Sequence, residues 1–178
     1  VCYAAMSRFA PDPKALKAHP VPSWFEDAKF GIFVHWSLSC VPAFAPRSGS
    51  LTELLQTRFH EIQKYSPYSE WYWNAMRIPG SPVAEHHAKV WGNAPYQEFR
   101  APFERMLETW DPAPWADLFA RAGAQYVVHV TKHHDGYCLW PASEQNPHQR
   151  HWASQRDVVG DLAHQLLDDV LQGDQPGR

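Results

Sequence analysis

Two groups of side chains that could bind a polar ligand lie at the carboxyl ends of apolar runs or directly after them. His35 and Trp36 end the first run, and His133, His134 and Asp135 follow the second. Neighbouring parallel strands in a sheet lie about 5 Å apart. If the two runs are such neighbours, imidazole donors and acceptors meet a carboxylate at one edge of the sheet.

A third group lies in the segment Ser69-Glu-Trp-Tyr-Trp73, which places the carboxylate of Glu70 among three aromatic rings, including that of Trp71. A bound sugar needs a partner for each hydroxyl that leaves water, because an unpaired buried polar group costs roughly 1–3 kcal/mol. An indole face can cover the patch of C–H groups on the sugar ring. The three groups together indicate a pocket for a neutral sugar.

The same residues allow a second interpretation, a metal site. His35, His133, His134 and Asp135 offer three imidazoles and one carboxylate, a donor set that zinc accepts. These donors come from different strands, however, and no local ligand motif such as HExxH fixes their geometry. We therefore expect no metal and no cofactor, and a metal-dependent hydrolase stays an alternative. His129, inside the second run, is most simply a structural residue.

Two short apolar runs predict the strands that carry these groups. Residues 30–36 and residues 125–131 are rich in β-branched and aromatic residues. Nearly continuous apolar runs are typical of parallel strands buried on both faces. The core is therefore expected to include five aromatic side chains: Trp24, Phe30, Phe33, Trp91 and Trp115.

Helical periodicity and capping residues predict the elements around the strands. The expected helices cover residues 24–29, 111–123 and 157–171. Ser23 would cap the first helix, and the prolines at the start of the second are tolerated in a first turn. Residues 37–109 are rich in proline and are expected to form a long loop with short helices, the clearest over residues 83–91.

The order strand, long loop, helix, strand, long loop, helix is typical of parallel βα units. In (β/α)8 barrels the active site lies at the carboxyl ends of the strands, where the polar groups gather here. We predict an α/β fold: a partial (β/α)8-type barrel of about two βα units with long βα loops. Residues 1–178 would form this single, truncated domain.

Charge and hydropathy exclude several classes of partner. The 16 basic residues are outnumbered by 19 acidic ones, whereas nucleic-acid binding needs clustered positive charge. No apolar run approaches the length of a membrane span, and the first residues lack the pattern of a signal peptide. Three widely spaced cysteines, Cys2, Cys40 and Cys138, form neither a disulfide framework nor a CxxC motif. We therefore expect a soluble protein without nucleic-acid or membrane partners.

Four motifs, in the same order, resemble the amino-terminal part of α-L-fucosidases of glycoside hydrolase family 29. The resemblance covers about residues 22–165. The motifs are Trp24-Phe-Glu-Asp-Ala-Lys-Phe-Gly-Ile-Phe-Val-His-Trp36, Glu70-Trp-Tyr, Gln125-Tyr-Val-Val with Thr131-Lys-His-His-Asp-Gly136, and Arg156-Asp-Val-Val-Gly-Asp-Leu162.

The resemblance implies a (β/α)8-like barrel, usually followed by a β-sandwich, that hydrolyses terminal α-L-fucose of oligosaccharides or glycoconjugates with retention. It also implies fucose contact by the matched residues His35, Glu70, Trp71, His133 and His134. These are the residues that the chemistry of the side chains had already singled out.

The catalytic groups of such an enzyme have no match in the sequence. Retaining glycosidases use two carboxylates about 5–5.5 Å apart, one as nucleophile and one as acid and base. The resemblance implies that both come from later strands. Asp135 is the tentative catalytic candidate, while Glu70 is assigned to hydroxyl binding. A non-catalytic, fucose-binding remnant of such an enzyme is therefore an alternative to an active hydrolase.

Two βα units are about a quarter of a barrel. Their apolar strand edges would lie open, and such edges invite pairing with another chain. The sequence is therefore expected to be either a fragment of a longer enzyme or a homo-oligomer in which copies cover these surfaces.

Overall fold

The computed structural model describes residues 12–18, 20–144 and 146–173. The amino-terminal residues, on which the signal-peptide expectation rests, and Cys2 lie outside these ranges. Cys40 and Cys138 are free thiols. Among the helices of the described residues, none combines the length and the apolar character needed to cross a membrane.

The two predicted strands are present and parallel. Strand β1 covers Gly31–His35 and β2 covers Tyr126–Val130, with Phe33 opposite Val128 in the register. Their carboxyl ends therefore lie at the same edge of the sheet, as the sequence predicts. The helix before β1, α2, covers Ser23–Ala28, but Pro22 and not Ser23 occupies its N-cap position.

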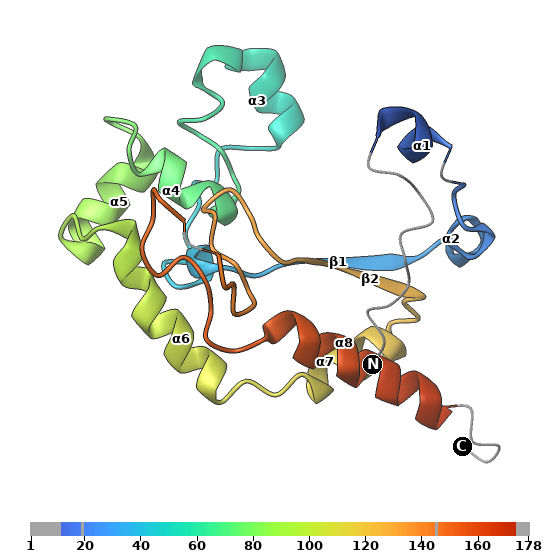
Figure 1. Cartoon of the computed structure of the whole chain (residues 1–178). Helices are drawn as coiled ribbons and strands as arrows, with labels where there is room; N and C mark the ends of the chain where they lie inside the picture. Colours follow the sequence, from blue (N-terminus) through green and yellow to red (C-terminus); the bar gives the residue numbers. More distant parts are fainter. Residues whose placement is uncertain (1–11, 19, 145, 174–178) are drawn as a thin grey trace.

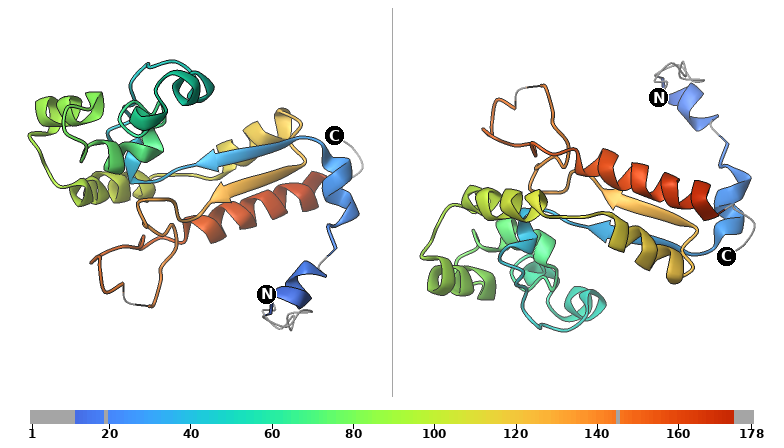
Figure 2. Two further views of the ribbon diagram at one scale, coloured as in Figure 1. Left: turned by 90° about the horizontal axis from the view of Figure 1, so that it is seen from above. Right: turned by 90° about the horizontal axis from the view of Figure 1, so that it is seen from below.

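Helices α7 (Ala113–Arg121) and α8 (Val158–Gly173) pack together. Both lie on the same face of the two-stranded sheet (Figure 2). They match the predicted helices, although α8 ends at Gly173, two residues beyond the predicted range of 157–171. The side chain of Asp111 accepts a hydrogen bond from the backbone N–H of Ala113 and so satisfies a free donor of the first turn of α7.

The segment between β1 and α7 contains more helix than the predicted long loop with short helices, and the helix expected over residues 83–91 is present. After β1 the chain curves around the carboxyl ends of the strands (Figure 1). Pro82 and Pro102 each lie in the first turn of a helix, where backbone N–H groups have no intrahelical partner, so proline ends neither helix. The elements are η1 (Leu38–Cys40), α3 (Leu51–Thr57), η2 (Phe59–Glu61), η3 (Ser69–Trp71), α4 (Tyr72–Ala75), α5 (Pro82–Trp91), η4 (Tyr96–Phe99) and α6 (Arg100–Glu108); α1 (Pro13–Lys17) precedes α2.

The tightest core lies within this helical segment and the loop after β2. Its fully buried side chains include Leu38, Tyr72, Tyr96, Phe99, Phe103, Leu107, Tyr137 and Leu139. Of the five predicted core aromatics, Trp91 packs against this cluster, and Trp115 contacts Trp36 with ring centroids 4.8 Å apart. Trp24, Phe30 and Phe33 were predicted wrongly.

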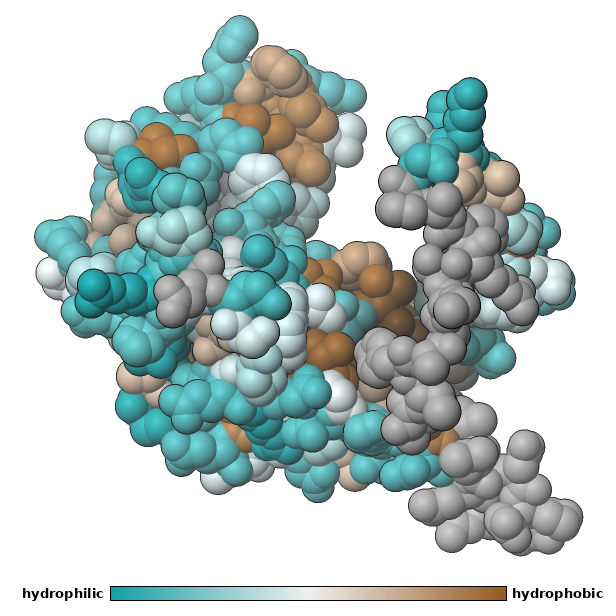
Figure 3. Space-filling view, in the orientation of Figure 1, coloured by the Kyte–Doolittle hydropathy of each residue, from teal (hydrophilic) through white to brown (hydrophobic). Residues whose placement is uncertain are grey.

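Helices α7 and α8 cover only one face of the sheet (Figure 2). The face away from α7 and α8 carries Phe33, which is 61% exposed, and its neighbour Val128, which is 37% exposed. Hydrophobic surface is visible over the strands (Figure 3). The expectation that both faces are buried fails because, within the described residues, the contacts of Trp24 and Phe25 of α2 with Tyr126 cover this second face at its amino-terminal end and leave Phe33 and Val128 exposed. Trp24 and Phe30 are about half exposed.

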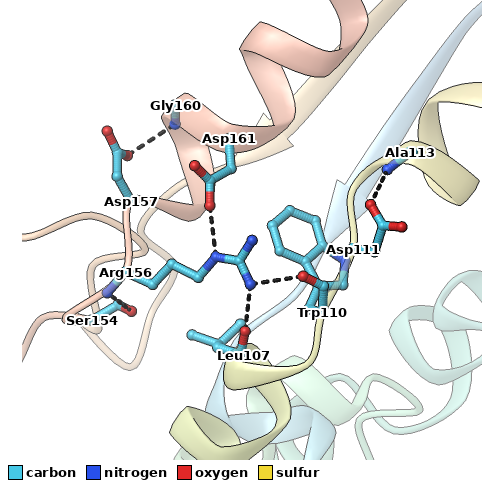
Figure 4. A network of polar contacts seen from close by, with 9 residues as sticks. All are labelled: Leu107, Trp110, Asp111, Ala113, Ser154, Arg156, Asp157, Gly160 and Asp161. Carbon is cyan, nitrogen blue, oxygen red and sulfur yellow. Dashed lines mark hydrogen bonds and ion pairs between the residues drawn. The ribbon is translucent and has the colours of Figure 1, made fainter.

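Arg156 ties the loop after β2 to the junction of α6 and α7 (Figure 4). Its guanidinium donates to Asp161 Oδ2 at 2.6 Å, to the backbone oxygen of Trp110 at 2.7 Å and to that of Leu107. The guanidinium also lies over the Trp110 ring, 5.0 Å from the ring centroid. Arg156 thus fixes the loop that leads away from the polar edge of the sheet.

Candidate functional site

The predicted site residues come from three segments at the carboxyl end of the sheet. His35 is the last residue of β1, Glu70 and Trp71 lie in η3, and His133 and His134 lie in a turn after β2. The turn is closed by a hydrogen bond from the Gly136 N–H to the carbonyl oxygen of His133. Gly136 has a φ of +72°, a conformation that glycine adopts without strain.

Four of these aromatic rings form a continuous row. The ring centroids of His35 and His133 are 5.1 Å apart, and those of His133 and His134 are 4.5 Å apart. The row continues from His134 to Trp71, again at 5.1 Å. The structure therefore brings together the segments that the sequence places about 35 and 60 residues apart.

A pocket of about 470 Å³ opens beside this row. Its lining consists of two carboxylates, two indole rings, an imidazole, two amides and a guanidinium: Gln63, Glu70, Trp71, Trp73, Asn74, Arg77, His134 and Asp135. His35 and His133 are not part of this lining; they continue the ring row beyond His134. Four of the six predicted site residues thus line one pocket.

Asp135 is buried although it reaches the pocket wall, with an exposed fraction of 3%. Its Oδ2 accepts a hydrogen bond from the Tyr96 hydroxyl at 3.0 Å, and its Oδ1 accepts one from the backbone N–H of Tyr137 at 3.0 Å. Both carboxylate oxygens therefore have partners within the protein.

Burial lowers the pKa of His133, and the neighbouring His134 and His35 lower it further. The negative charges of Glu70 and Asp135 act in the opposite direction, but burial is the larger effect. The imidazole is therefore neutral at neutral pH. Its Nδ1 is buried without a hydrogen-bond partner.

The metal-site interpretation finds no support in the described part of the chain. In residues 12–18, 20–144 and 146–173, no three His, Cys, Asp or Glu side chains are arranged so that they could hold a metal ion.

Comparison with known proteins identifies the family of the chain. The family model described as alpha-L-fucosidase matches residues 2–172, nearly the whole chain. The chain belongs to the α-L-fucosidase family. Among curated family members, the tissue α-L-fucosidase of Bos taurus is 35% identical over 164 residues, and the α-L-fucosidase of Dictyostelium discoideum is 35% identical over 164 residues.

Solved structures of α-L-fucosidase family members share the fold of this chain. An α-L-fucosynthase of Thermotoga maritima, in complex with α-L-Fuc-(1-2)-β-L-Fuc-N3, is 42% identical with a TM-score of 0.77, over 90% of this chain and 36% of that one. The α-fucosidase of the same organism in complex with fucose is 41% identical with a TM-score of 0.73, over 90% of this chain and 35% of that one.

The chain spans a minor part of the α-L-fucosidases that it matches. The match covers 87% of this chain but 28% of the bovine enzyme and 30% of the Dictyostelium enzyme.

Four lining residues of the pocket were not predicted: Gln63, Trp73, Asn74 and Arg77. A signal for two of them exists in the sequence, because Glu70, Asn74 and Arg77 are spaced i, i+4 and i+7, which places side chains on one face of a helix. Gln63 has no such signal; its Oε1 accepts a hydrogen bond from Asn74 Nδ2 at 3.0 Å, a contact that only the folded chain shows.

Proposed function

We propose that this chain provides the L-fucose-binding part of an α-L-fucosidase that acts on terminal α-L-fucose of oligosaccharides or glycoconjugates. The observation that carries the proposal is the pocket in which Glu70, Trp71 and His134 share one wall. Membership of the α-L-fucosidase family supports L-fucose as the sugar that binds. The polar and aromatic side chains of the lining support a sugar as the class of ligand.

Each of these side chains matches one feature of a deoxysugar. The Glu70 carboxylate accepts hydrogen bonds from sugar hydroxyls, and the imidazole of His134 can donate one and accept another. The Trp71 indole offers an apolar face to the C–H groups and the methyl group. The volume of about 470 Å³ leaves room for a monosaccharide and part of the group attached to it.

The strands support a matching proposal about architecture. Parallel β1 and β2 place the site at their carboxyl ends, with α7 and α8 on one face. This arrangement is that of neighbouring βα units in a (β/α)8 barrel, whose active site lies at that end. We propose that the open face of the sheet corresponds to the inner face of such a barrel.

Hydrolysis with retention would need a carboxylate nucleophile and a second carboxyl group as acid and base. Glu70 and Asp135 are the carboxylates that line the pocket within the described residues. Asp135 stays the catalytic candidate predicted from the sequence. Its two internal hydrogen bonds favour a carboxylate held in one place over one that attacks a sugar carbon.

Calorimetric titration with L-fucose tests the binding proposal, with D-fucose as the matched control. The two enantiomers have identical hydroxyl and methyl content, so they differ only in how these groups meet the pocket wall. We expect saturable binding of L-fucose and at least about tenfold weaker binding of D-fucose. Equal affinities, or no binding of L-fucose, would contradict the proposal.

Hydrolysis of an aryl α-L-fucoside separates an active hydrolase from a non-catalytic, fucose-binding remnant. If carboxylates of this chain suffice, we expect slow turnover, because even a slightly misplaced group costs orders of magnitude in rate. Full activity of Asp135→Asn would reject Asp135 as a catalytic group. Binding of L-fucose without any turnover favours the remnant.

We also propose that the chain associates with itself through the open face of its sheet. Phe33 and Val128 are neighbours there and are both exposed. A second copy that presents the same face would remove these apolar side chains from water, the main favourable contribution to association.

A further inference from the structure

We propose that Tyr96 is a positioning residue for sugar binding: its hydroxyl holds the carboxylate of Asp135, and this carboxylate fixes the turn that presents His133 and His134. This inference rests on the proposed function, because it assigns a role at the same pocket. Tyr96 lies in η4, 39 residues before Asp135 in the sequence, and does not line the pocket itself.

The carboxylate of Asp135 joins two parts of the chain. On one side Tyr96, which is 1% exposed, donates its hydroxyl hydrogen to Oδ2 at 3.0 Å. On the other side the backbone N–H of Tyr137 donates to Oδ1 at 3.0 Å. The turn that begins at His133 is therefore anchored to the helical core through one buried side chain.

A buried carboxylate is stable only when hydrogen bonds replace its lost hydration. Burial, together with the negative charge of Asp135, raises the pKa of Tyr96, so the phenol stays protonated and remains a donor. Loss of this donor would leave Oδ2 unpaired next to the pocket. The side chain of Asp135, and the turn with it, would then shift toward water.

Tyr96 also contacts a second residue of the pocket lining, Trp73. Its ring stacks on the Trp73 indole, with centroids 5.2 Å apart and planes 9° apart. Trp73 lines the pocket together with Trp71, and Trp71 in turn contacts His134. Tyr96 thus contacts both an indole ring of the pocket lining and the carboxylate that holds the histidine turn.

The variant Tyr96→Phe keeps the ring stack and removes only the hydroxyl. We expect it to weaken L-fucose affinity by about tenfold, the scale of one buried hydrogen bond to a charged group. The matched control is Tyr72→Phe. Tyr72 is fully buried, and its hydroxyl makes a 2.9 Å hydrogen bond with Nδ1 of His87 instead of with the turn. This control is expected to lose a similar amount of thermal stability and to keep its L-fucose affinity within about twofold.

Substitutions of Asp135 separate a positioning role from a general loss of stability. In Asp135→Asn the amide oxygen can still accept from the Tyr137 N–H, while its NH2 group donates to the Tyr96 hydroxyl oxygen. This conservative variant is expected to keep its L-fucose affinity within about threefold of the wild type. The L-fucose affinity of Asp135→Ala is expected to fall at least as far as that of Tyr96→Phe. Equal losses in Asp135→Asn and Asp135→Ala would overturn the inference.

Histidine NMR spectra of the ligand-free protein test the inference without any sugar. The imidazole resonances of His133 and His134 should move in Tyr96→Phe and stay in place in Tyr72→Phe. Unmoved resonances in Tyr96→Phe, or unchanged L-fucose affinity of this variant, overturn the positioning role. Wild-type protein that does not bind L-fucose contradicts the proposed function instead, so the two failures are distinguishable.

Discussion

His129 and His133 show how burial sets the charge of an imidazole at the scale of single residues. The pKa of each is lowered, with burial as the main cause. Both ring nitrogens of His129 are buried without a partner, as is Nδ1 of His133. His129 lies within β2, opposite Val34, and not in the pocket, which agrees with the structural role predicted for it.

These lowered pKa values predict a loss of stability in acid. The folded chain holds both imidazoles neutral, whereas the unfolded chain takes up protons below the ordinary pKa of 6.5. The free energy of unfolding should therefore fall as the pH drops below that value. We expect His129→Val to reduce this fall, as measured by urea denaturation at neutral pH and at about pH 5. An unchanged pH dependence in the variant would contradict the assignment.

His134 lines the pocket, so its removal should act on the sugar directly. We expect His134→Ala to weaken L-fucose binding by about 1–3 kcal/mol, because a sugar hydroxyl loses its partner. His35→Ala should also weaken binding, through the ring row in which His35 contacts His133. The control is His164→Ala on α8, an exposed position away from the pocket. Unchanged affinity in both site variants, measured by tryptophan fluorescence, would remove the pocket assignment.

The sequence indicated which candidate site residues lie close together where chemistry and local order coincide. His133, His134 and Asp135 are adjacent in the sequence, and a strand before them is easy to recognise. Tyr96 was missed because its contact with Asp135 spans 39 residues, and nothing local distinguishes it from other core tyrosines. Long-range partners of this kind appear only once the chain is folded.

At the scale of elements, the strands and the helices with clear periodicity were predicted correctly, including α5 and α7, which hold proline in the first turn. The other helices between β1 and α7 were not predicted individually. Both strands and α7 and α8 lie within a few residues of the expected ranges. Helix α6 was not predicted individually because the proline-rich segment that contains it was expected to be mainly loop, although proline is tolerated in a first turn. The burial of Phe33 was also predicted wrongly, because an apolar strand does not itself show which faces neighbours cover.

Substitution of Arg156 tests whether its hydrogen bonds hold α6, the junction before α7, and α8 together. Arg156 donates to one carboxylate and two carbonyl oxygens that join three segments of the chain. Lysine keeps the charge but lacks the planar fork that reaches all three. We expect Arg156→Lys to lower the free energy of unfolding by about 1–3 kcal/mol.

The matched control for this prediction is Arg121→Lys, because Arg121 also pairs with an aspartate, Asp117, at 2.9 Å. That pair is exposed on both sides, with exposed fractions of 68% and 64%. Exposed pairs contribute about 0–1 kcal/mol, so the control should change stability little. Equal effects of the two substitutions in chemical denaturation would contradict the role given to Arg156.

At the scale of the whole molecule, the sequence predicts self-association, and the exposed face of the sheet is the surface to which we assign it. Phe33, at 61% exposed, stacks on His35 with centroids 4.9 Å apart, so the apolar face is continuous with the ring row. Association through this face would bring a second copy close to the pocket.

We therefore predict a homo-oligomer at micromolar concentration that Phe33→Ser weakens. The substitution removes an exposed apolar side chain from the centre of the face. Leu118→Ser is the matched control, because Leu118 is 52% exposed on α7, away from that face. Light scattering measures the mass in solution. A wild-type mass equal to one chain, or equal weakening by both variants, would contradict this prediction.

The most direct test of the central claim, that L-fucose binds in the pocket lined by Trp71 and His134, is histidine NMR during a titration with L-fucose. The imidazole resonances of His134 should shift first and most, and those of His133 should follow through their ring contact. The resonances of His87, buried against Tyr72, and of His164 on α8 should stay in place. Shifts confined to these remote histidines, or none at all at saturating sugar, would contradict the account.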